Sequence, residues 1–411
     1  MTAATRTRPD RSLSLYHLLD PAVLANPYPL YARLRSEDPV HWDPFLHAWI
    51  VTRYADVVTV FQQFSSDRTP RPEHLEALGL GALSPLARVM VRQMLFMDGP
   101  GHGRIRGLAA RAFTPRRIEG LRAHIGEIVE GLLDAVAPQG RLDIINDLAY
   151  PLPAIVTAEL LGVPAADRDQ LKLWSEDFAE VLGNFQHNPD RAANAVKSVE
   201  AMCDYFREAI REHRDHPRDD LISAFIAAEI GGDRLNEEEM IANLIITMVG
   251  GQETTTNLIG NGMLTLLRHP EALAELRADL SLIPAAVEEL LRFESPSQHT
   301  ARLAPADTIL GGKAIRRRQA VIAVMGAANR DPERFPDPDR FDLRRTDNRH
   351  LAFAWANHFC FGAPLARMEA QIAFTHLLRR FPTITQETPT VTWRENMGLR
   401  GLIALPVFVE S

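Results

Sequence analysis

Residues 353–367 read FAWANHFCFGAPLAR and place one cysteine, Cys360, just ahead of a predicted helix. This helix should run from about Pro364 to Arg380, because proline is tolerated in a first helical turn and Pro382 ends the pattern. A thiolate at Cys360 would be stabilised by the free N–H groups and the positive dipole end of the helix. The sulfur could act as a nucleophile or as a single metal ligand, although an isolated cysteine is more often a buried, inert thiol.

The neighbours of Cys360 favour a flat ligand over an aqueous nucleophile, because four aromatic side chains would form an apolar wall around the sulfur. These residues are Phe353, Trp355, Phe359 and Phe361. The second cysteine, Cys203, stands among apolar residues at helical spacing, which is typical of a core position. Two cysteines are too few for a disulfide framework or for a zinc or iron–sulfur site built from cysteine.

A second helix is predicted from about Asn236 to Arg268, and it contains the sequence GGQETTT at residues 250–256. Asn236 and Glu239 form a capping box that fixes its start. Each glycine costs ~1 kcal/mol in a helix interior relative to alanine. The glycines could let a flat ligand approach the backbone, beside a carboxylate and a hydroxyl suited to a proton relay. A kink or close helix packing would explain the same glycines equally well.

The rest of the chain predicts a mainly α protein with a minor β region, an α+β class. Helical periodicity dominates residues 123–268, whereas residues 40–42, 48–52 and 303–324 contain strand-like pieces. No repeat or low-complexity linker separates two halves. We therefore expect a disordered lead-in over residues 1–14 and a single large domain over residues 15–411.

Composition and charge exclude several classes of protein. The 411 residues are 46% hydrophobic and 24% charged, which is typical of a globular chain. With 45 basic and 53 acidic residues, the net charge of −8 argues against nucleic-acid binding. Apolar runs such as Leu244–Gly251 and Ala320–Ala328 are shorter than the ~18 residues of a spanning helix. We expect no membrane anchor and no signal peptide, and a cytoplasmic location.

Two charged pairs stand at helical spacing. Glu289 and Arg292 share a helix face three residues apart, an arrangement that by itself is common on surfaces. His102 and Arg106, four residues apart, could hold an anion jointly, although such pairs more often face solvent.

Taken together, these motifs resemble the cytochrome P450 family of haem-thiolate monooxygenases in its soluble bacterial form. The resemblance extends over nearly the whole chain, and the cysteine segment of residues 353–367 is its most specific element. Glu253 and Thr254 match the acid–alcohol pair that serves oxygen activation in this family. Glu289 and Arg292 match its E-x-x-R pair, and Arg340 matches the arginine that completes a Glu–Arg–Arg cluster.

The resemblance implies a P450 fold, one helical domain that encloses haem b, and O₂ as co-substrate. Cys360 would be the ligand of the iron, and Glu253 and Thr254 would be catalytic. Haem propionates would be bound by a set of four cationic or imidazole side chains, namely His102, Arg106, Arg302 and His358. In one respect the chain departs from the family, because Ala354 and Ala356 stand where glycine is usual. Alanine would strain or reshape a loop that needs a positive φ at these positions.

The implied activity is hydroxylation or epoxidation of an apolar small molecule. Gln186, His187 and Gln298 are candidate polar anchors for that substrate. Since the chain shows no flavin or iron–sulfur domain, electrons would come from a ferredoxin and its reductase. Arginines on the cysteine side would attract an acidic ferredoxin, namely Arg104, Arg111, Arg116 and Arg117.

Three alternatives remain at this point. The first is a peroxygenase that uses hydrogen peroxide directly, and the second is a non-catalytic protein that binds haem or an apolar ligand. The third is a helical protein without haem, in which Cys360 is simply buried.

Overall fold

The computed structural model describes residues 12–183 and 189–410. The α-helices are α1 (Pro21–Ala25), α2 (Tyr28–Glu37), α3 (Tyr54–Gln63), α4 (Pro72–Ala77), α5 (Ser84–Met90), α6 (Gly101–Ala112), α7 (Pro115–Gly120), α8 (Arg122–Val136), α9 (Pro151–Leu161), α10 (Arg168–Gly183), α11 (Pro189–Asp215), α12 (Leu221–Ala227), α13 (Glu237–Arg268), α14 (Pro270–Ala278), α15 (Ile283–Phe293), α16 (Met325–Ala328) and α17 (Ala363–Arg380). The strands are β1 (Val40–Asp43), β2 (Ala48–Val51), β3 (Arg141–Asp143), β4 (His299–Leu303), β5 (Thr308–Leu310), β6 (Lys313–Ile315), β7 (Ala320–Val324), β8 (Thr383–Gln386) and β9 (Pro406–Glu410). The expected mainly helical chain with a minor β region is confirmed.

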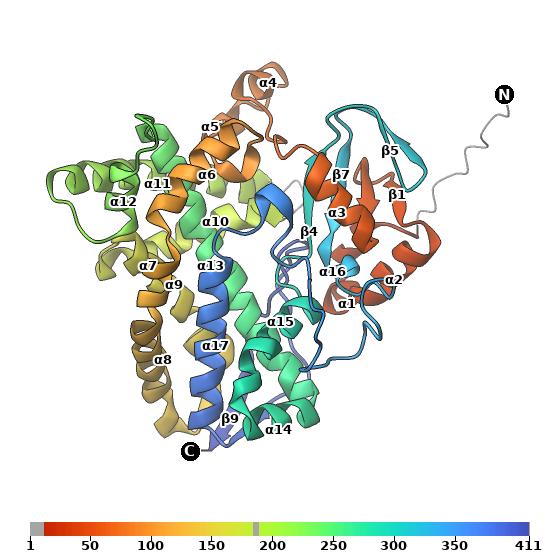
Figure 1. The fold of residues 1–411 in the computed structure, drawn as a ribbon, viewed down its shortest axis with the longest axis vertical. Coiled ribbons are helices and arrows are strands. Elements are labelled where there is room, and N and C mark those ends of the chain that lie inside the picture. Colours follow the sequence, from red (N-terminus) through yellow and green to blue (C-terminus); the bar gives the residue numbers. More distant parts are fainter. Residues whose placement is uncertain (1–11, 184–188, 411) are drawn as a thin grey trace.

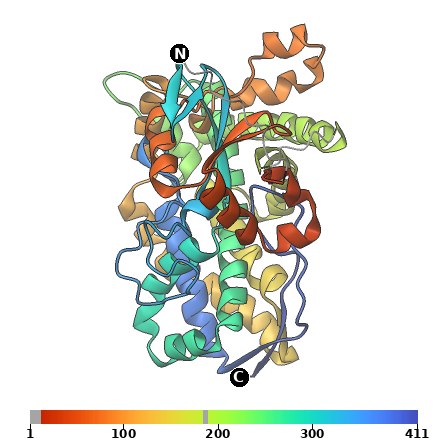
Figure 2. The same cartoon turned by 90° about the vertical axis from the view of Figure 1, so that its right-hand side faces the viewer.

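The principal sheet joins distant parts of the sequence in the order β1-β2-β7-β4. Strands β1 and β2 form an antiparallel pair, with Val40 opposite Val51, whereas β2 and β7 run parallel. Strand β4 pairs antiparallel with β7. This sheet and helices α1–α3 lie on one side of the molecule, and the long helices α8, α13 and α17 lie on the other (Figures 1 and 2).

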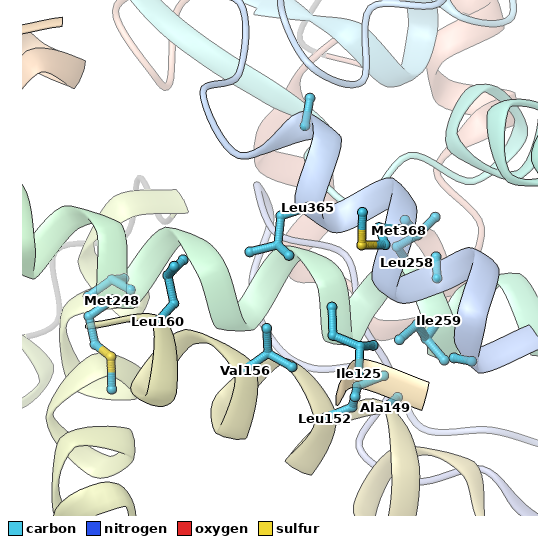
Figure 3. Packing of buried hydrophobic residues seen from close by; sticks show 14 of the residues in the cluster. Ile125, Ala149, Leu152, Val156, Leu160, Met248, Leu258, Ile259, Leu365 and Met368 are labelled. Carbon is cyan, nitrogen blue, oxygen red and sulfur yellow. The ribbon is translucent and has the colours of Figure 1, made fainter. Parts of the chain in front are cut away.

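Helix α13 is the central element of the helical side (Figure 1). The capping box predicted for its start is present, since the Asn236 side chain accepts from the Glu239 N–H and the Glu239 carboxylate accepts from the Asn236 N–H. Its apolar side chains pack between α9 and α17, as Val156, Leu258 and Leu365 show in Figure 3. Truncating one buried leucine here would cost roughly 2–5 kcal/mol. Core packing therefore fixes the position of α13 and of the side chains with which it lines the functional site.

Sequence inspection missed one long apolar segment. The span Ile144–Leu161 is long and apolar enough to cross a bilayer by length and composition, and 61% of it is buried inside the fold. It comprises a π-helical turn, η5 (Ile144–Ala149), and α9, both of which pack against α13. Burial against other helices is the usual position of a core segment, and it explains the apolar composition without a membrane.

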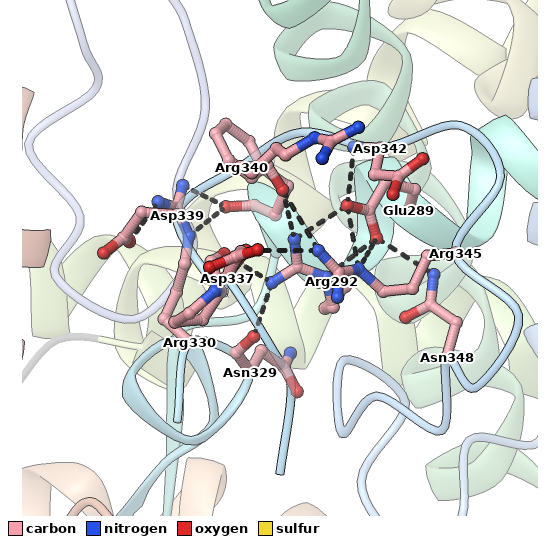
Figure 4. Close-up of polar contacts among 12 residues, drawn as sticks. Glu289, Arg292, Asn329, Arg330, Asp337, Asp339, Arg340, Asp342, Arg345 and Asn348 are labelled. Atoms are coloured by element: carbon pink, nitrogen blue, oxygen red, sulfur yellow. Dashed lines mark hydrogen bonds and ion pairs between the residues drawn. The ribbon is translucent and has the colours of Figure 1, made fainter. Parts of the chain in front are cut away.

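Glu289 and Arg292 form a fully buried ion pair, with Arg292 Nη2 2.7 Å from Glu289 Oε1 (Figure 4). The prediction that Arg340 completes this cluster was wrong, because Arg345 does so, with Nε 3.2 Å from Glu289 Oε2. The N–H of Arg340 closes a turn on the carbonyl oxygen of Asp337, and its side chain is exposed. Arg340 contributes only its carbonyl oxygen, which accepts from Arg292 and Arg345. The cluster anchors the loop that leads to the cysteine segment.

The predicted lead-in over residues 1–14 lies outside the described residues for positions 1–11. Its last two residues belong to the fold, because Leu13 and Ser14 are buried. The Ser14 hydroxyl donates to Asp43 Oδ2 at 2.7 Å, which ties this segment to β1.

Candidate functional site

A cavity of about 350 Å³ lies between α13, the cysteine segment and β4. All seven side chains that the sequence marked out for catalysis or cofactor binding line this cavity, although they come from distant parts of the chain: His102, Arg106, Glu253, Thr254, Arg302, His358 and Cys360. Most of the remaining wall is apolar. The cavity is therefore suited to a large apolar ligand that has polar groups at one edge.

Cys360 lies on the wall of the cavity, three residues before α17 begins at Ala363. Its own N–H donates to the carbonyl oxygen of Phe353 at 2.8 Å, which closes the cysteine segment into a loop. Burial raises the pKa of the Cys360 thiol, whereas the N–H groups of Gly362 and Ala363 and the charge of Arg106 lower it. The helix start thus acts on the sulfur as expected, but burial outweighs it in the protein alone.

Ala354 and Ala356 adopt the left-handed backbone conformation that glycine favours, with φ of +58° and +57°. This conformation costs an L-residue roughly 1–2 kcal/mol. The loop nevertheless keeps its hydrogen bonds, including one from the Ala354 N–H to the carbonyl oxygen of Leu351 at 2.9 Å. Alanine therefore strains this loop, as expected from the sequence, without opening it.

One edge of the cavity gathers hydrogen-bond donors. The rings of His102 and His358 contact each other at a tilt of 32°, with centroids 4.1 Å apart. Burial lowers the pKa of each, that of His358 to about 3. Arg302 is 2% exposed, and its Nε has no hydrogen-bond partner among the described residues. The Nε2 atom of His102 is buried without a partner in the same part of the structure. Arg106 donates to the carbonyl oxygen of Phe359 at 2.7 Å. Such an edge lacks an acceptor, which a carboxylate would supply.

The adjacent glycines Gly250 and Gly251 of α13 serve different purposes. A Cβ at Gly250 would meet nothing within 4 Å, so the helix backbone is open to the cavity there. A Cβ at Gly251 would lie 2.6 Å from Thr157 Oγ1, so this glycine permits close packing against α9. Close helix packing therefore explains Gly251, whereas Gly250 leaves room for a ligand to approach the backbone.

Glu253 and Thr254 follow these glycines and also line the cavity. The Thr254 hydroxyl donates to the carbonyl oxygen of Gly250 at 3.1 Å, which leaves its lone pairs free to accept. The Glu253 carboxylate accepts from Arg394 at 2.7 and 2.8 Å and from Asn257 Nδ2 at 3.2 Å. The acid of the pair is thus held by an arginine from the C-terminal part of the chain.

Sequence reasoning missed three functional candidates, of which Arg68 and Glu369 line the cavity. Arg68 lines the wall near Arg302, and Arg394 holds Glu253. Glu369 on α17 is 1% exposed, and neither of its carboxyl oxygens has a hydrogen bond of ordinary geometry within the described ranges. Burial raises the pKa of Glu369 to about 8, an effect that the Thr255 hydroxyl opposes only in part. A lone Arg or Glu carries no spacing signal, so only the tertiary fold could reveal these residues.

The structure does not place any of the three candidate substrate anchors at the cavity. Gln298 does not line the cavity, because its side chain is buried and donates to the carbonyl oxygen of Ser295 at 2.7 Å. Gln186 and His187 lie outside the described residues.

A cavity with one thiol on its wall, an open helix backbone at Gly250 and a donor-rich edge is suited to a flat, anionic cofactor whose metal a thiolate can bind. The chain belongs to the cytochrome P450 family, whose model, described as Cytochrome P450, matches residues 83–406. It is accordingly an oxidoreductase of the monooxygenase class with the P450 fold.

Individual relatives support this assignment. The chain is 42% identical over 398 residues to "Cytochrome P450 monooxygenase PikC" of Streptomyces venezuelae, covering 93% of this chain and 91% of the relative. It is 40% identical to "Biotin biosynthesis cytochrome P450" of Bacillus subtilis (strain 168), covering 94% and 97%. Among solved structures, P450BioI in complex with an acyl carrier protein ligated to hexadec-9Z-enoic acid is similar, with a TM-score of 0.90, 38% identity and coverage of 95% and 99%.

Proposed function

We propose that the protein is a single-domain monooxygenase, spanning residues 15–411, that holds haem b through Cys360. Bound haem would activate O₂ for insertion of one oxygen atom into a C–H bond or an alkene, with the other atom reduced to water. The observation that carries the proposal is the chemical match of the cavity to haem. It offers one thiol on its wall, an open backbone at Gly250, and unpartnered nitrogen atoms on Arg302 and His102.

Four side chains would hold the haem carboxylates, namely His102, Arg106, Arg302 and His358. All line one cavity with Cys360. Because a partly buried carboxylate needs charge-assisted donors, the unsatisfied nitrogens at this edge fit the two propionates of the cofactor.

Glu253 and Thr254 would manage protons and water on the opposite wall. The Thr254 hydroxyl, which already donates to Gly250, is free to accept a hydrogen bond from a group in the cavity. Glu253 would pass a proton inward when it separates from Arg394, since in the ion pair its carboxylate is occupied.

The substrate would be an apolar small molecule. The wall of the cavity on the α13 side carries Met94, Leu95, Ile246, Val249 and Leu399, with few polar groups between them. Such walls select by size and shape, and a small number of polar contacts fix orientation. The complex of P450BioI with an acyl carrier protein shows that a relative of this chain binds a long apolar chain, which is in keeping with the proposal.

Electrons would come from a ferredoxin and its reductase, and the enzyme would work in the cytoplasm. Of the four arginines suggested for ferredoxin attraction, Arg104 pairs with Asp233 and Glu239, and Arg117 pairs with Asp219. Arg111 and Arg116 are exposed and form no ion pair with a described residue, so we assign the attraction to these two. Electron transfer should weaken as ionic strength rises and in an R111Q/R116Q variant.

A peroxide-driven reaction is the second candidate, and one observation favours it. The Glu253 carboxylate is engaged by Arg394, which limits its use as a proton donor. Product formation with O₂, NADPH and a ferredoxin system, compared with hydrogen peroxide alone, separates the two. We expect the ferredoxin system to give far more product, and the reverse would favour the peroxygenase. A haem protein with no product under either condition would be a ligand binder.

A further inference from the structure

Arg68 lies beside Arg302 at the cavity. The chain that follows α3 pairs with the end of β4, since Ser65 and Leu303 exchange N–H to carbonyl hydrogen bonds at 2.8 and 2.9 Å. Arg68 follows Ser65 by three residues, and Arg302 precedes Leu303 by one. Both arginines line the same cavity, as do His102 and His358.

Asp98 is a carboxylate whose charge acts on both guanidinium groups, but it forms an ion pair with neither. Neither Arg68 nor Arg302 forms an ion pair with a residue in the described ranges. The carboxylate of Asp98, whose charge acts on Arg68, already accepts hydrogen bonds from the Ser65 hydroxyl and from the Ser66 N–H. Among the described residues, the Arg68 side chain makes one long hydrogen bond, from Nη1 to the carbonyl oxygen of Ser66 at 3.3 Å, and it lies over the ring of Phe96.

We propose that Arg68, together with Arg302, binds a carboxylate group inside the cavity. Two enclosed cations without an ion-pair partner are costly, and a carboxylate between them would lower that cost through charge-assisted hydrogen bonds. This inference rests on the proposed function, because the carboxylate belongs either to the haem edge or to an apolar ligand with an acid group.

The electrostatics of the pair agree with this placement. Burial and the charge of Arg302 together lower the pKa of Arg68 to about 9, while the charge of Asp98 acts in the opposite direction. Burial also lowers the pKa of Arg302 to about 10. Both groups therefore remain cations at neutral pH, and each would be stabilised by an anion that reaches the cavity.

The test uses the haem-bearing protein with the variants R68Q and R68K. R71Q is the matched control, since Arg71 lies on the same segment with a side chain that is 58% exposed and pairs with Asp67. For the haem carboxylates, the readouts are the propionate bending mode in the resonance Raman spectrum and the rate of haem transfer to apomyoglobin. For a ligand carboxylate, the probes are dodecanoic acid and its methyl ester, whose dissociation constants follow from spin-state titrations.

We expect R68Q to raise either the rate of haem transfer or the dissociation constant of dodecanoic acid by about tenfold or more, because one charged interaction is lost. R68K should restore part of this loss, and R71Q should have no effect. A shifted propionate mode with faster haem transfer would assign Arg68 to the cofactor. Weaker binding of dodecanoic acid, with the ester unchanged, would assign it to the ligand. If R68Q leaves all readouts unchanged, or weakens acid and ester equally, the inference is wrong. A wild-type protein that carries no haem would instead contradict the proposed function.

Discussion

Glu253 and Arg394 form an ion pair across the cavity wall, with Arg394 Nη1 2.8 Å from Oε1 and 2.7 Å from Oε2 of the carboxylate. The two residues are 141 positions apart in the sequence. The acid on the central helix is therefore positioned by a segment that comes after the cysteine loop.

This pairing leads to the first prediction. We expect E253Q to lower turnover by about 100-fold or more while haem content stays constant, because a general acid is worth roughly 10²–10⁴ in rate. R394Q breaks the same ion pair but keeps the carboxylate, so its loss should be much smaller. Product formation by both variants is the measurement, with E395Q as an exposed control on the same segment. Equal losses in E253Q and R394Q would assign Glu253 a structural role only.

Thr254 gives the second prediction. T254A should keep its haem and its ligand affinity, but divert reducing equivalents to hydrogen peroxide, because the hydroxyl that accepts from the cavity is lost. The control is T247A, since Thr247 also lines the cavity and donates to a carbonyl oxygen four residues back, that of Asn243 at 2.7 Å. Peroxide release per NADPH consumed is the readout. An unchanged ratio in T254A, or an equal change in T247A, would contradict the role of Thr254.

The third prediction concerns the strained backbone of the cysteine loop. A354G and A356G should each raise the free energy of unfolding by about 0.5–1 kcal/mol, since glycine removes the left-handed strain of roughly 1–2 kcal/mol but adds unfolded-state entropy. A32G on the exposed face of α2 should instead lower the free energy of unfolding, because glycine costs about 1 kcal/mol in a helix interior. Denaturant titration measures all three. Destabilisation by A354G and A356G would show that the strain is absent.

The fourth prediction concerns Glu369 and pH. Burial raises the pKa of Glu369 from 4.5 to about 8. Between these pH values the carboxyl is therefore protonated in the folded protein but ionised in the unfolded chain. The stability contribution of the protonated carboxyl is present below pH 4.5 and is lost as the pH rises toward 8, by up to roughly 1.4 kcal/mol per pH unit.

E369Q should remove this pH dependence, because glutamine stays neutral. Unfolding free energies of wild type and variant at several pH values between 5 and 9 give the test, with the exposed substitution E73Q as control. The advantage of E369Q over wild type should grow as the pH rises. Parallel curves for the two proteins would show that Glu369 does not titrate in this way.

Local signals predicted much of this architecture. The capping box at Asn236 and the proline at position 364 located two helices, and the cysteine segment with its neighbours indicated the site. The positive φ at Ala354 and Ala356 was expected from the family resemblance, because glycine is usual at these positions in the family.

Tertiary relationships were not accessible in the same way. Whether Arg340 or Arg345 reaches Glu289 depends on a turn at Asp337, which no periodicity reveals. Arg68 reaches the cavity because its segment pairs with β4, and Arg394 reaches Glu253 because the C-terminal segment approaches α13. Charges that are paired across long sequence distances have no spacing rule, so only the folded structure identifies them.

The binding of haem through Cys360 is tested most directly by the spectrum of the reduced protein with carbon monoxide. We expect the purified protein to carry haem and to show the red-shifted Soret band of thiolate ligation. C360S should lose that band, whereas C203S, at a cysteine packed in the helical core, should keep it. A wild-type protein without haem, or a band that survives in C360S, would contradict the account.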